Sequence, residues 1–95
     1  MLSAARALLK FSRERGHAAG AIVPLEACVA ALESGDIKAA IREFDRMSFG
    51  GMGRFDDWFP PAIYDHEDEA YVQAVFEALV ERFCRLFRTA AGRTT

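Results

Sequence analysis

The feature that most constrains the fold is a long helical pattern of apolar residues near the C-terminal end, between Glu67 and Thr89. The apolar residues in this segment are Tyr71, Val72, Val75, Phe76, Leu79, Val80, Phe83, Cys84, Leu86 and Phe87. They recur at the three- and four-residue spacing of an α-helix. Because the apolar face is too wide for contact with one neighbouring helix, we expect this helix to be central, with the other helices packed around it.

Three shorter segments upstream have the same period. The apolar spacing predicts helices over about Leu2–Arg15, Pro24–Ser34 and Ile37–Met47. No segment shows a convincing strand pattern, and 95 residues are enough for one small core. The sequence therefore predicts an all-α fold, a single four-helix domain over residues 1–95 whose tail, about 90–95, is frayed.

Glycine, proline and short polar residues suggest where these helices begin and end. Ser3 is a candidate cap for the first helix, and Gly16 is expected to end it. Pro24 suits the first turn of the second helix, and the residues just before it fit either a loop or an extra turn. Gly35 and Asp36 predict a short joint, with Asp36 capping the third helix.

Composition argues against several classes of protein. The chain is 52% hydrophobic and 27% charged, which is too apolar for a disordered protein. No apolar run reaches the roughly 20 residues that span a bilayer, and a net charge of −2 argues against nucleic-acid binding. The N-terminal segment does not have the pattern of a secretory signal, and its arginines leave a transit peptide as a minor alternative. We therefore expect a cytoplasmic protein.

The two cysteines, Cys28 and Cys84, both lie inside helical apolar patterns. Free cysteine behaves as a small apolar residue, so buried thiols are the favoured interpretation. A disulfide between two helices is the alternative, and it would require an oxidising compartment.

A glycine-rich and aromatic loop, roughly Phe49 to His66, separates the third and fourth helices. Its glycines follow a helix and are succeeded by Asp56 and Asp57, so a phosphate-binding loop is disfavoured. We expect Gly50–Gly53 to end the helix and pack closely, with Met52 filling a gap in the core.

The sequence predicts neither an enzyme nor a metal or cofactor site. The acidic run Asp65–Glu69 lacks the spacing of a calcium loop, and only His17 and His66 could supply imidazole for zinc. Capping of the fourth helix by Asp65 or His66 explains the run more simply. No serine lies in a nucleophile elbow.

A protein-binding role fits the loop better, because aromatic residues beside acids are typical of interfaces. Pro60 and Pro61 would stiffen the loop, and its acids suit a basic partner. The alternative is that Trp58 and Phe59 fold back over the core. The predicted contact residues are Arg54, Phe55, Asp56, Asp57, Trp58, Tyr64, Asp65, Glu67, Asp68 and Glu69.

The stretch "FGGMGRFDDWFPP", with the Gly35–Asp36 joint upstream, resembles a family of small bacterial all-helical proteins of unknown function. Their mark is a Gly-Gly-Met-Gly-Ser-x-Asn-Asp-like turn, although here Arg54 replaces the serine and Asp56 stands where asparagine is frequent. Such proteins resemble immunity proteins of type VI secretion and related toxin systems. The resemblance implies a cognate protein toxin as partner and no catalytic residues, and the acids of the loop suit a basic active-site surface on that toxin. The alternative is a structural or regulatory module that forms a homodimer through the fourth helix.

Overall fold

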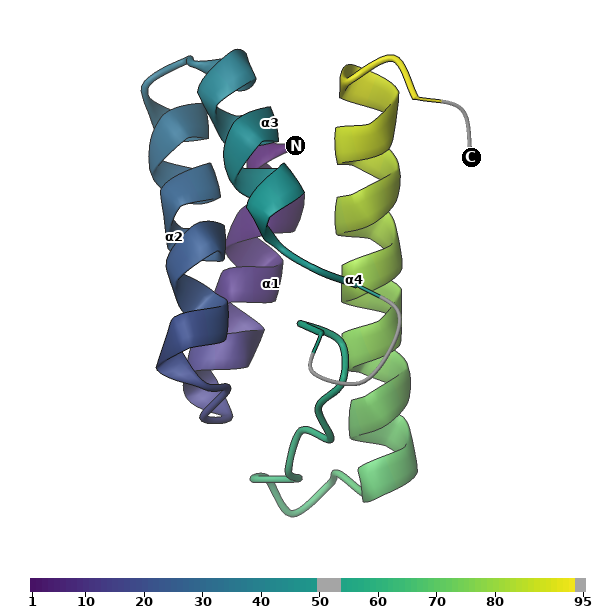
Figure 1. The fold of residues 1–95 in the computed structure, drawn as a ribbon. Helices are drawn as coiled ribbons and strands as arrows, with labels where there is room; N and C mark the ends of the chain where they lie inside the picture. The colour runs from purple at the N-terminus through teal and green to yellow at the C-terminus, as the bar shows by residue number, and fades with distance from the viewer. Residues whose placement is uncertain (50–53, 94–95) are drawn as a thin grey trace.

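The computed structural model describes residues 1–49 and 54–93, and these residues form four α-helices and no strand. The helices are α1 (Leu2–Glu14), α2 (Ala19–Glu33), α3 (Ile37–Arg46) and α4 (Glu69–Ala90), shown in Figure 1. The predicted all-α fold is confirmed. The turn expected at Gly50–Gly53, with its proposed core contact from Met52, lies outside the described residues.

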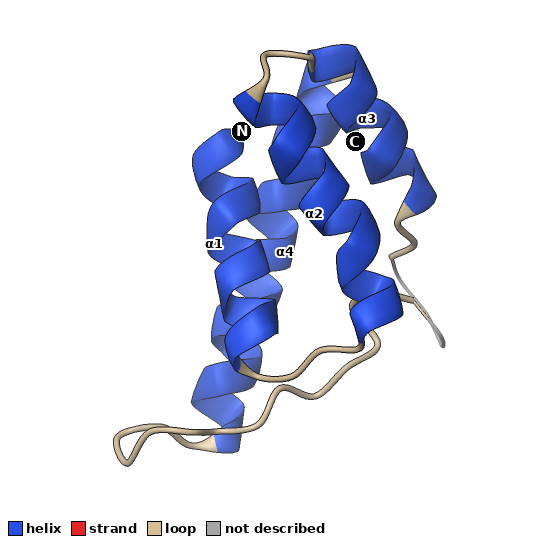
Figure 2. Ribbon diagram, turned by 90° about the vertical axis from the view of Figure 1, so that its left-hand side faces the viewer, coloured by secondary structure: helices blue, strands red, loops and turns tan. Residues whose placement is uncertain are grey.

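Helix α4 does not have the central position that its wide apolar face suggests. In Figure 1, α2 and α4 lie on opposite sides of the bundle, with α1 and α3 between them, and the view in Figure 2 agrees. The apolar face of α4 contacts α1 and also the aromatic loop that precedes α4. Trp58 from this loop packs edge-on against Phe76 of α4, with ring centroids 5.1 Å apart. A long loop thus covers surface that a third helix was expected to cover.

Aromatic side chains join α3 to α4. The Phe44 ring lies 5.6 Å from that of Phe83 and 5.0 Å from that of Phe87, measured between centroids. All three side chains are buried. Aromatic rings at these separations add attraction beyond the burial of their area, so this cluster ties α4 to the α2–α3 hairpin.

Two predicted helix ends are confirmed. Gly16 and Gly35 follow α1 and α2 and have positive φ angles of 79° and 78°, a conformation that glycine adopts without strain. The side chain of Asp36 caps α3 by accepting a hydrogen bond from the backbone N–H of Ala39 at 3.0 Å.

Two predicted caps are wrong. No side chain caps α1, whose N-cap residue is Met1, so Ser3 lies within the helix. Helix α4 is capped by Asp68, which accepts from the backbone N–H of Tyr71 at 2.7 Å. Any acid of the run before α4 could cap in principle, and the geometry of the loop decides which one does.

Helix α2 begins at Ala19, five residues before the predicted start, so the residues upstream of Pro24 form an extra helical turn. Pro24 therefore lies inside the helix, where it cannot donate to the carbonyl four residues earlier. That carbonyl belongs to Gly20. The sequence predicted that α2 begins at Pro24 because proline destabilises a helix least in its first turn.

Cys28 and Cys84 are both buried and free, as the favoured interpretation expects. Burial raises the pKa of the Cys28 thiol to about 12 and that of Cys84 to about 11. The Cys28 thiol also donates a hydrogen bond to the carbonyl of Ala40 at 3.4 Å. Both thiols are therefore kept protonated at neutral pH.

We expect both thiols to react slowly with thiol reagents in the folded protein, because the thiolate is the reactive form. At pH 8 the native protein should react with a disulfide reagent about a hundredfold or more slowly than the urea-unfolded protein. Absorbance of the released thiolate measures both rates. If either native thiol reacted as fast as free cysteine, its burial in the fold described here would be wrong.

No helix of the described residues has the length and hydropathy needed to cross a membrane.

Candidate functional site

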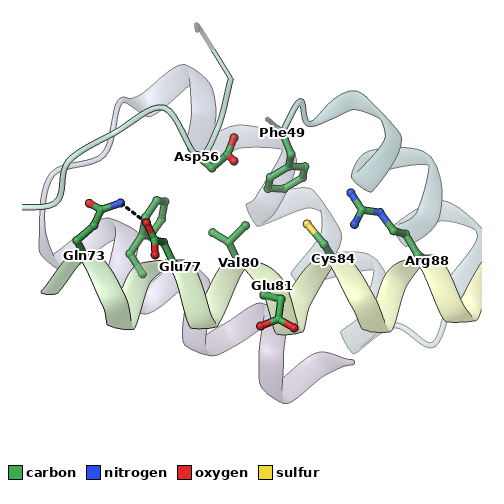
Figure 3. Close-up of a pocket in the computed structure, with 9 residues that line it drawn as sticks. Phe49, Asp56, Gln73, Glu77, Val80, Glu81, Cys84 and Arg88 are labelled. Atoms are coloured by element: carbon green, nitrogen blue, oxygen red, sulfur yellow. Dashed lines mark hydrogen bonds between the residues drawn. The ribbon is translucent and has the colours of Figure 1, made fainter. Parts of the chain in front are cut away.

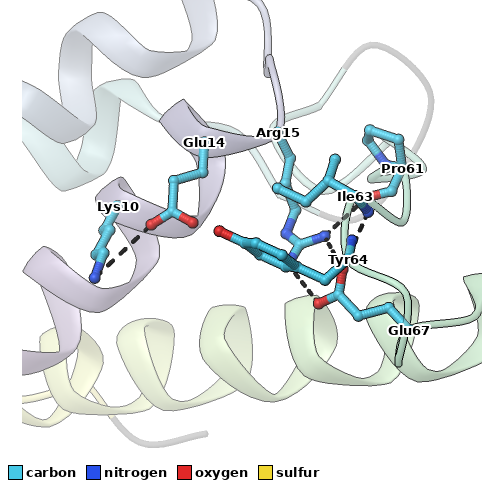
Figure 4. Close-up of polar contacts among 7 residues, drawn as sticks. All are labelled: Lys10, Glu14, Arg15, Pro61, Ile63, Tyr64 and Glu67. Carbon is cyan, nitrogen blue, oxygen red and sulfur yellow. Dashed lines mark hydrogen bonds and ion pairs between the residues drawn. The ribbon is translucent and has the colours of Figure 1, made fainter.

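The loop between α3 and α4 is fastened to the end of α1 by a buried ion pair. Arg15 donates to both carboxylate oxygens of Glu67, at 2.9 and 2.6 Å, as Figure 4 shows. Each side chain is only 6% exposed. Arg15 also donates to the carbonyl of Pro61 at 2.9 Å. We call this Arg15–Glu67 pair the clasp, because it joins residues 52 positions apart.

The clasp also organises the backbone of the loop. Glu67 Oε1 accepts from the backbone N–H groups of Ile63 and Tyr64, both at 3.1 Å. The hydrogen bonds from Arg15, assisted by these two, outweigh the effect of burial and lower the pKa of Glu67 to about 2. The same bond raises the pKa of Arg15. The guanidinium also lies 4.6 Å from the ring centroid of Phe11, a cation–π contact.

The clasp should make stability depend on pH in acid. The pKa of Glu67 falls from its ordinary 4.5 to about 2 on folding, so between these values the unfolded chain binds more protons than the folded chain. The contribution of Glu67 is complete above about pH 4.5 and is lost as pH falls towards 2. We expect the urea midpoint of Glu67→Gln to change less over this window than that of the wild type. Some dependence should remain, because Arg93 also lowers the pKa of Asp45. Equal slopes for the two proteins would contradict the role of the clasp.

His17 makes a second attachment between the end of α1 and the loop. Its backbone N–H donates to the carbonyl of Ser12 at 3.0 Å, which closes the turn after α1. Its side chain Nε2 lies 2.8 Å from the carbonyl oxygen of Phe55, so Nε2 carries the proton and donates it. The imidazole stacks on the ring of Phe55 at 4.6 Å and lies against that of Trp58 at 4.2 Å. Loop residues 55 and 58 are therefore held against the core.

Three of the predicted contact residues face inward. Phe55 is only 4% exposed, and Trp58 is half-buried against the core. Glu67 is committed to the clasp. The alternative that both adjacent aromatics fold back over the core holds only for Trp58. Phe59 is 83% exposed.

The other predicted contacts remain accessible to different degrees. Asp56 is half-buried, and the exposed ones are Arg54, Asp57, Tyr64, Asp65, Asp68 and Glu69. The structure adds Phe59 and Ile63, which are 83% and 46% exposed. We define the loop face as six of the exposed residues at the end of the molecule where α4 begins, namely Phe59, Ile63, Tyr64, Asp65, Asp68 and Glu69.

The loop face lies in the most acidic part of the chain. Seven acidic residues and one arginine occur between residues 54 and 77. One of the seven, Glu67, is neutralised by Arg15. The rest surround Phe59 and Tyr64 in sequence, so exposed aromatic rings are combined with negative charge.

Sequence reasoning missed the two residues that hold the loop, Arg15 and His17. In the sequence, Arg15 is one of several basic residues near the end of the first helix, and His17 stands out only as an imidazole for a metal site. Within residues 1–49 and 54–93, no three potential metal-ligating side chains converge. The sequence signal that could have identified Arg15 is its positive charge beside the helix-ending Gly16. Many exposed arginines occupy the same kind of position, so this signal does not single out Arg15.

No protein-family model matches the chain, and comparisons with curated proteins and with solved structures found no match either. The resemblance of the glycine turn to immunity proteins therefore stays a prediction.

Proposed function

We propose that this protein is a binding protein without catalytic activity, and that its loop face docks on a basic surface of another protein. The observation that carries the proposal is Phe59, a large apolar side chain that is 83% exposed on a loop held by a buried ion pair. A mobile loop would let such a ring turn inward. Here His17 holds Phe55 and Trp58 before Phe59, and the buried Pro60 and the clasp fix the backbone after it.

Two physical effects support binding at this face. The first is that a loop fastened in advance loses little conformational freedom on docking, and this saves part of the cost of association. The second is that negative charge around an aromatic anchor attracts a basic partner and speeds the encounter. Phe59 and Tyr64 would supply the apolar contacts, and Asp65 and Glu69 would supply the charge.

We infer that the partner is a cognate toxin, in the manner of the immunity proteins that the turn resembles. A toxin that acts on nucleic acid or on a phosphate-bearing substrate holds it with basic residues. An acidic loop face could occupy that basic site and block the substrate. This more specific form of the proposal depends on the resemblance, whereas the choice of face depends on exposure and charge.

The test compares Phe59→Ser with Ile37→Ser as a matched control. Ile37 is also an exposed apolar residue, at 51%, and it lies at the start of α3, towards the other end of the bundle (Figure 1). Partners are captured from a lysate of the source organism, identified by mass spectrometry and then titrated as purified proteins. We expect Phe59→Ser to weaken binding at least tenfold, as loss of a hot-spot residue does. Co-expression with the captured protein should restore growth only for the wild type and the control.

Equal binding by both variants would show that the loop face is not the docking surface. A captured partner that is not toxic would reject the immunity form alone.

A second candidate is self-association through α4. Tyr71 is 51% exposed, and Val75 and Leu86 are half-buried. Light scattering over a range of protein concentrations distinguishes the two candidates. A stable dimer that Tyr71→Ser dissociates would favour this second function.

A further inference from the structure

A cleft lies between the aromatic loop and the first turns of α4, at the edge of the loop face. It encloses about 280 Å³ and is lined by Phe59, Pro60, Pro61, Glu69 and Gln73. Ligand pockets usually enclose about 300–1,000 Å³, so this cleft is slightly smaller than those that hold a whole small molecule. Its size suits a single long side chain.

The amide of Gln73 is oriented so that its oxygen is left without a donor. The amide nitrogen donates to Glu77 at 3.2 Å, and Figure 3, centred on the neighbouring groove along α4, shows the oxygen on the side away from Glu77, towards the start of the helix. This oxygen is buried and has no hydrogen-bond partner within residues 1–49 and 54–93. Its partial negative charge is therefore not balanced by a donor.

The Glu69 carboxylate supplies a full negative charge. It is exposed, and its side chain makes no ion pair or hydrogen bond with any residue that the structure describes. Glu69 and Gln73 are four residues apart in α4, so they lie on the same face of the helix. The start of a helix carries about half a positive charge, but Glu69 and the adjacent Asp68 together outweigh it. The cleft therefore attracts a cation.

We propose that this cleft receives an arginine side chain of the partner protein. The aliphatic stem would lie along the ring of Phe59 and the two prolines, and the guanidinium would bind the Glu69 carboxylate through paired N–H groups. Arginine only donates hydrogen bonds, which suits the acceptor oxygens of Glu69 and Gln73. This proposal rests on the proposed function, which supplies the protein partner, and it adds which side chain that partner presents.

The clasp shows that arginine fits this combination of groups in the same protein. The guanidinium of Arg15 binds both oxygens of Glu67 and lies 4.6 Å from the ring centroid of Phe11. In the cleft, Glu69 and Phe59 again combine a carboxylate with an aromatic ring. Lysine can also reach a carboxylate, but its compact ammonium is more strongly hydrated and lacks the planar fork of N–H groups. An acidic side chain would be repelled by Glu69.

The first test uses arginine blocked as its N-acetyl methylamide, with blocked citrulline as a neutral control of nearly the same shape and blocked lysine as a second cation. Each compound is titrated into the folded protein and followed by its effect on backbone amide resonances. We expect the arginine compound to shift the signals of Phe59, Glu69 and Gln73 with a dissociation constant of about a millimolar, as is usual for ligands of this size. Citrulline should bind at least about fivefold more weakly, because it cannot form charge-assisted hydrogen bonds.

Matched variants test whether Glu69 is responsible. Glu69→Gln keeps the shape of the side chain and removes its charge, and Glu81→Gln removes the same charge from a side chain further along α4 that is 74% exposed. Glu69→Gln should weaken blocked arginine at least about fivefold, whereas Glu81→Gln should change the affinity less than about twofold because salt screens distant exposed charges. Equal binding of citrulline or of lysine, equal loss in both variants or shifts confined to other residues would each overturn the proposal.

Partner binding separates this proposal from the proposed function. If Phe59→Ser weakens partner binding while Glu69→Gln leaves it intact, the loop face stands and the arginine proposal falls. If blocked arginine binds the cleft but neither variant weakens partner binding, the loop face falls as the docking surface, whereas the selectivity of the cleft for arginine stands.

Discussion

Replacing Arg15 by methionine is expected to destabilise the protein much more than the loss of an exposed ion pair does, because the Arg15 and Glu67 side chains are each only 6% exposed. Methionine keeps much of the length of the side chain but cannot donate a hydrogen bond. The change would leave Glu67 buried and ionised without its cation, and it would remove the donor to the carbonyl of Pro61. Urea unfolding at pH 7 measures the difference.

The matched control is Arg13→Met. Arg13 lies two residues away and also pairs with a glutamate, Glu26, but these side chains are 54% and 43% exposed. Exposed ion pairs contribute about 0–1 kcal/mol. Similar losses of stability for the two variants would mean that burial of the clasp does not increase its contribution to stability. Hydrogen exchange adds a local test, because the amides of Ile63 and Tyr64 should lose protection in Arg15→Met and keep it in Arg13→Met.

The helices could be predicted from the sequence because their signals are local. Apolar residues at helical spacing mark each helix, and Gly35 with Asp36 marks a joint through φ preference and side-chain capping. Local signals fail where two of them conflict. Pro24 is tolerated inside α2 because burial of the nearby Ile22 and Leu25 in the core outweighs one missing hydrogen bond.

The candidate site was predicted less completely because it depends on tertiary contacts. Glu67 belongs to an acidic run before a helix, where each acid has an equal local reason to be present. Only the folded loop shows that Glu67 meets Arg15, 52 residues away. Trp58 and Phe59 are adjacent and chemically similar. The direction of each ring follows from the loop backbone, which His17 holds at Phe55 and which continues into the buried Pro60. Position in the chain could identify the loop but not which rings face outward.

Phe76→Ala is the second change with a large expected effect, about 3–5 kcal/mol of destabilisation, as is usual for deleting a buried phenylalanine ring. Phe76 is 1% exposed, and its ring supports both the end of α1 and the loop. Its centroid lies 5.9 Å from that of Phe11, 6.1 Å from that of Phe55 and 5.1 Å from that of Trp58. A cavity at this position would remove contacts from all three at once.

Phe59→Ala is the matched control, because it deletes the same ring from a side chain that is 83% exposed. Such surface changes usually alter stability by no more than about 0.5 kcal/mol. The chain has one tryptophan, so its fluorescence reports on Trp58 alone.

In Phe76→Ala the emission under native conditions should shift to longer wavelength, since Trp58 loses the ring against which it packs edge-on. Global destabilisation without that shift would mean that the loop keeps its place through the clasp and His17. A shift with little destabilisation would mean that the loop opens as a separate unit. The expected result is both together, because the same ring belongs to the core and supports the loop that presents Phe59.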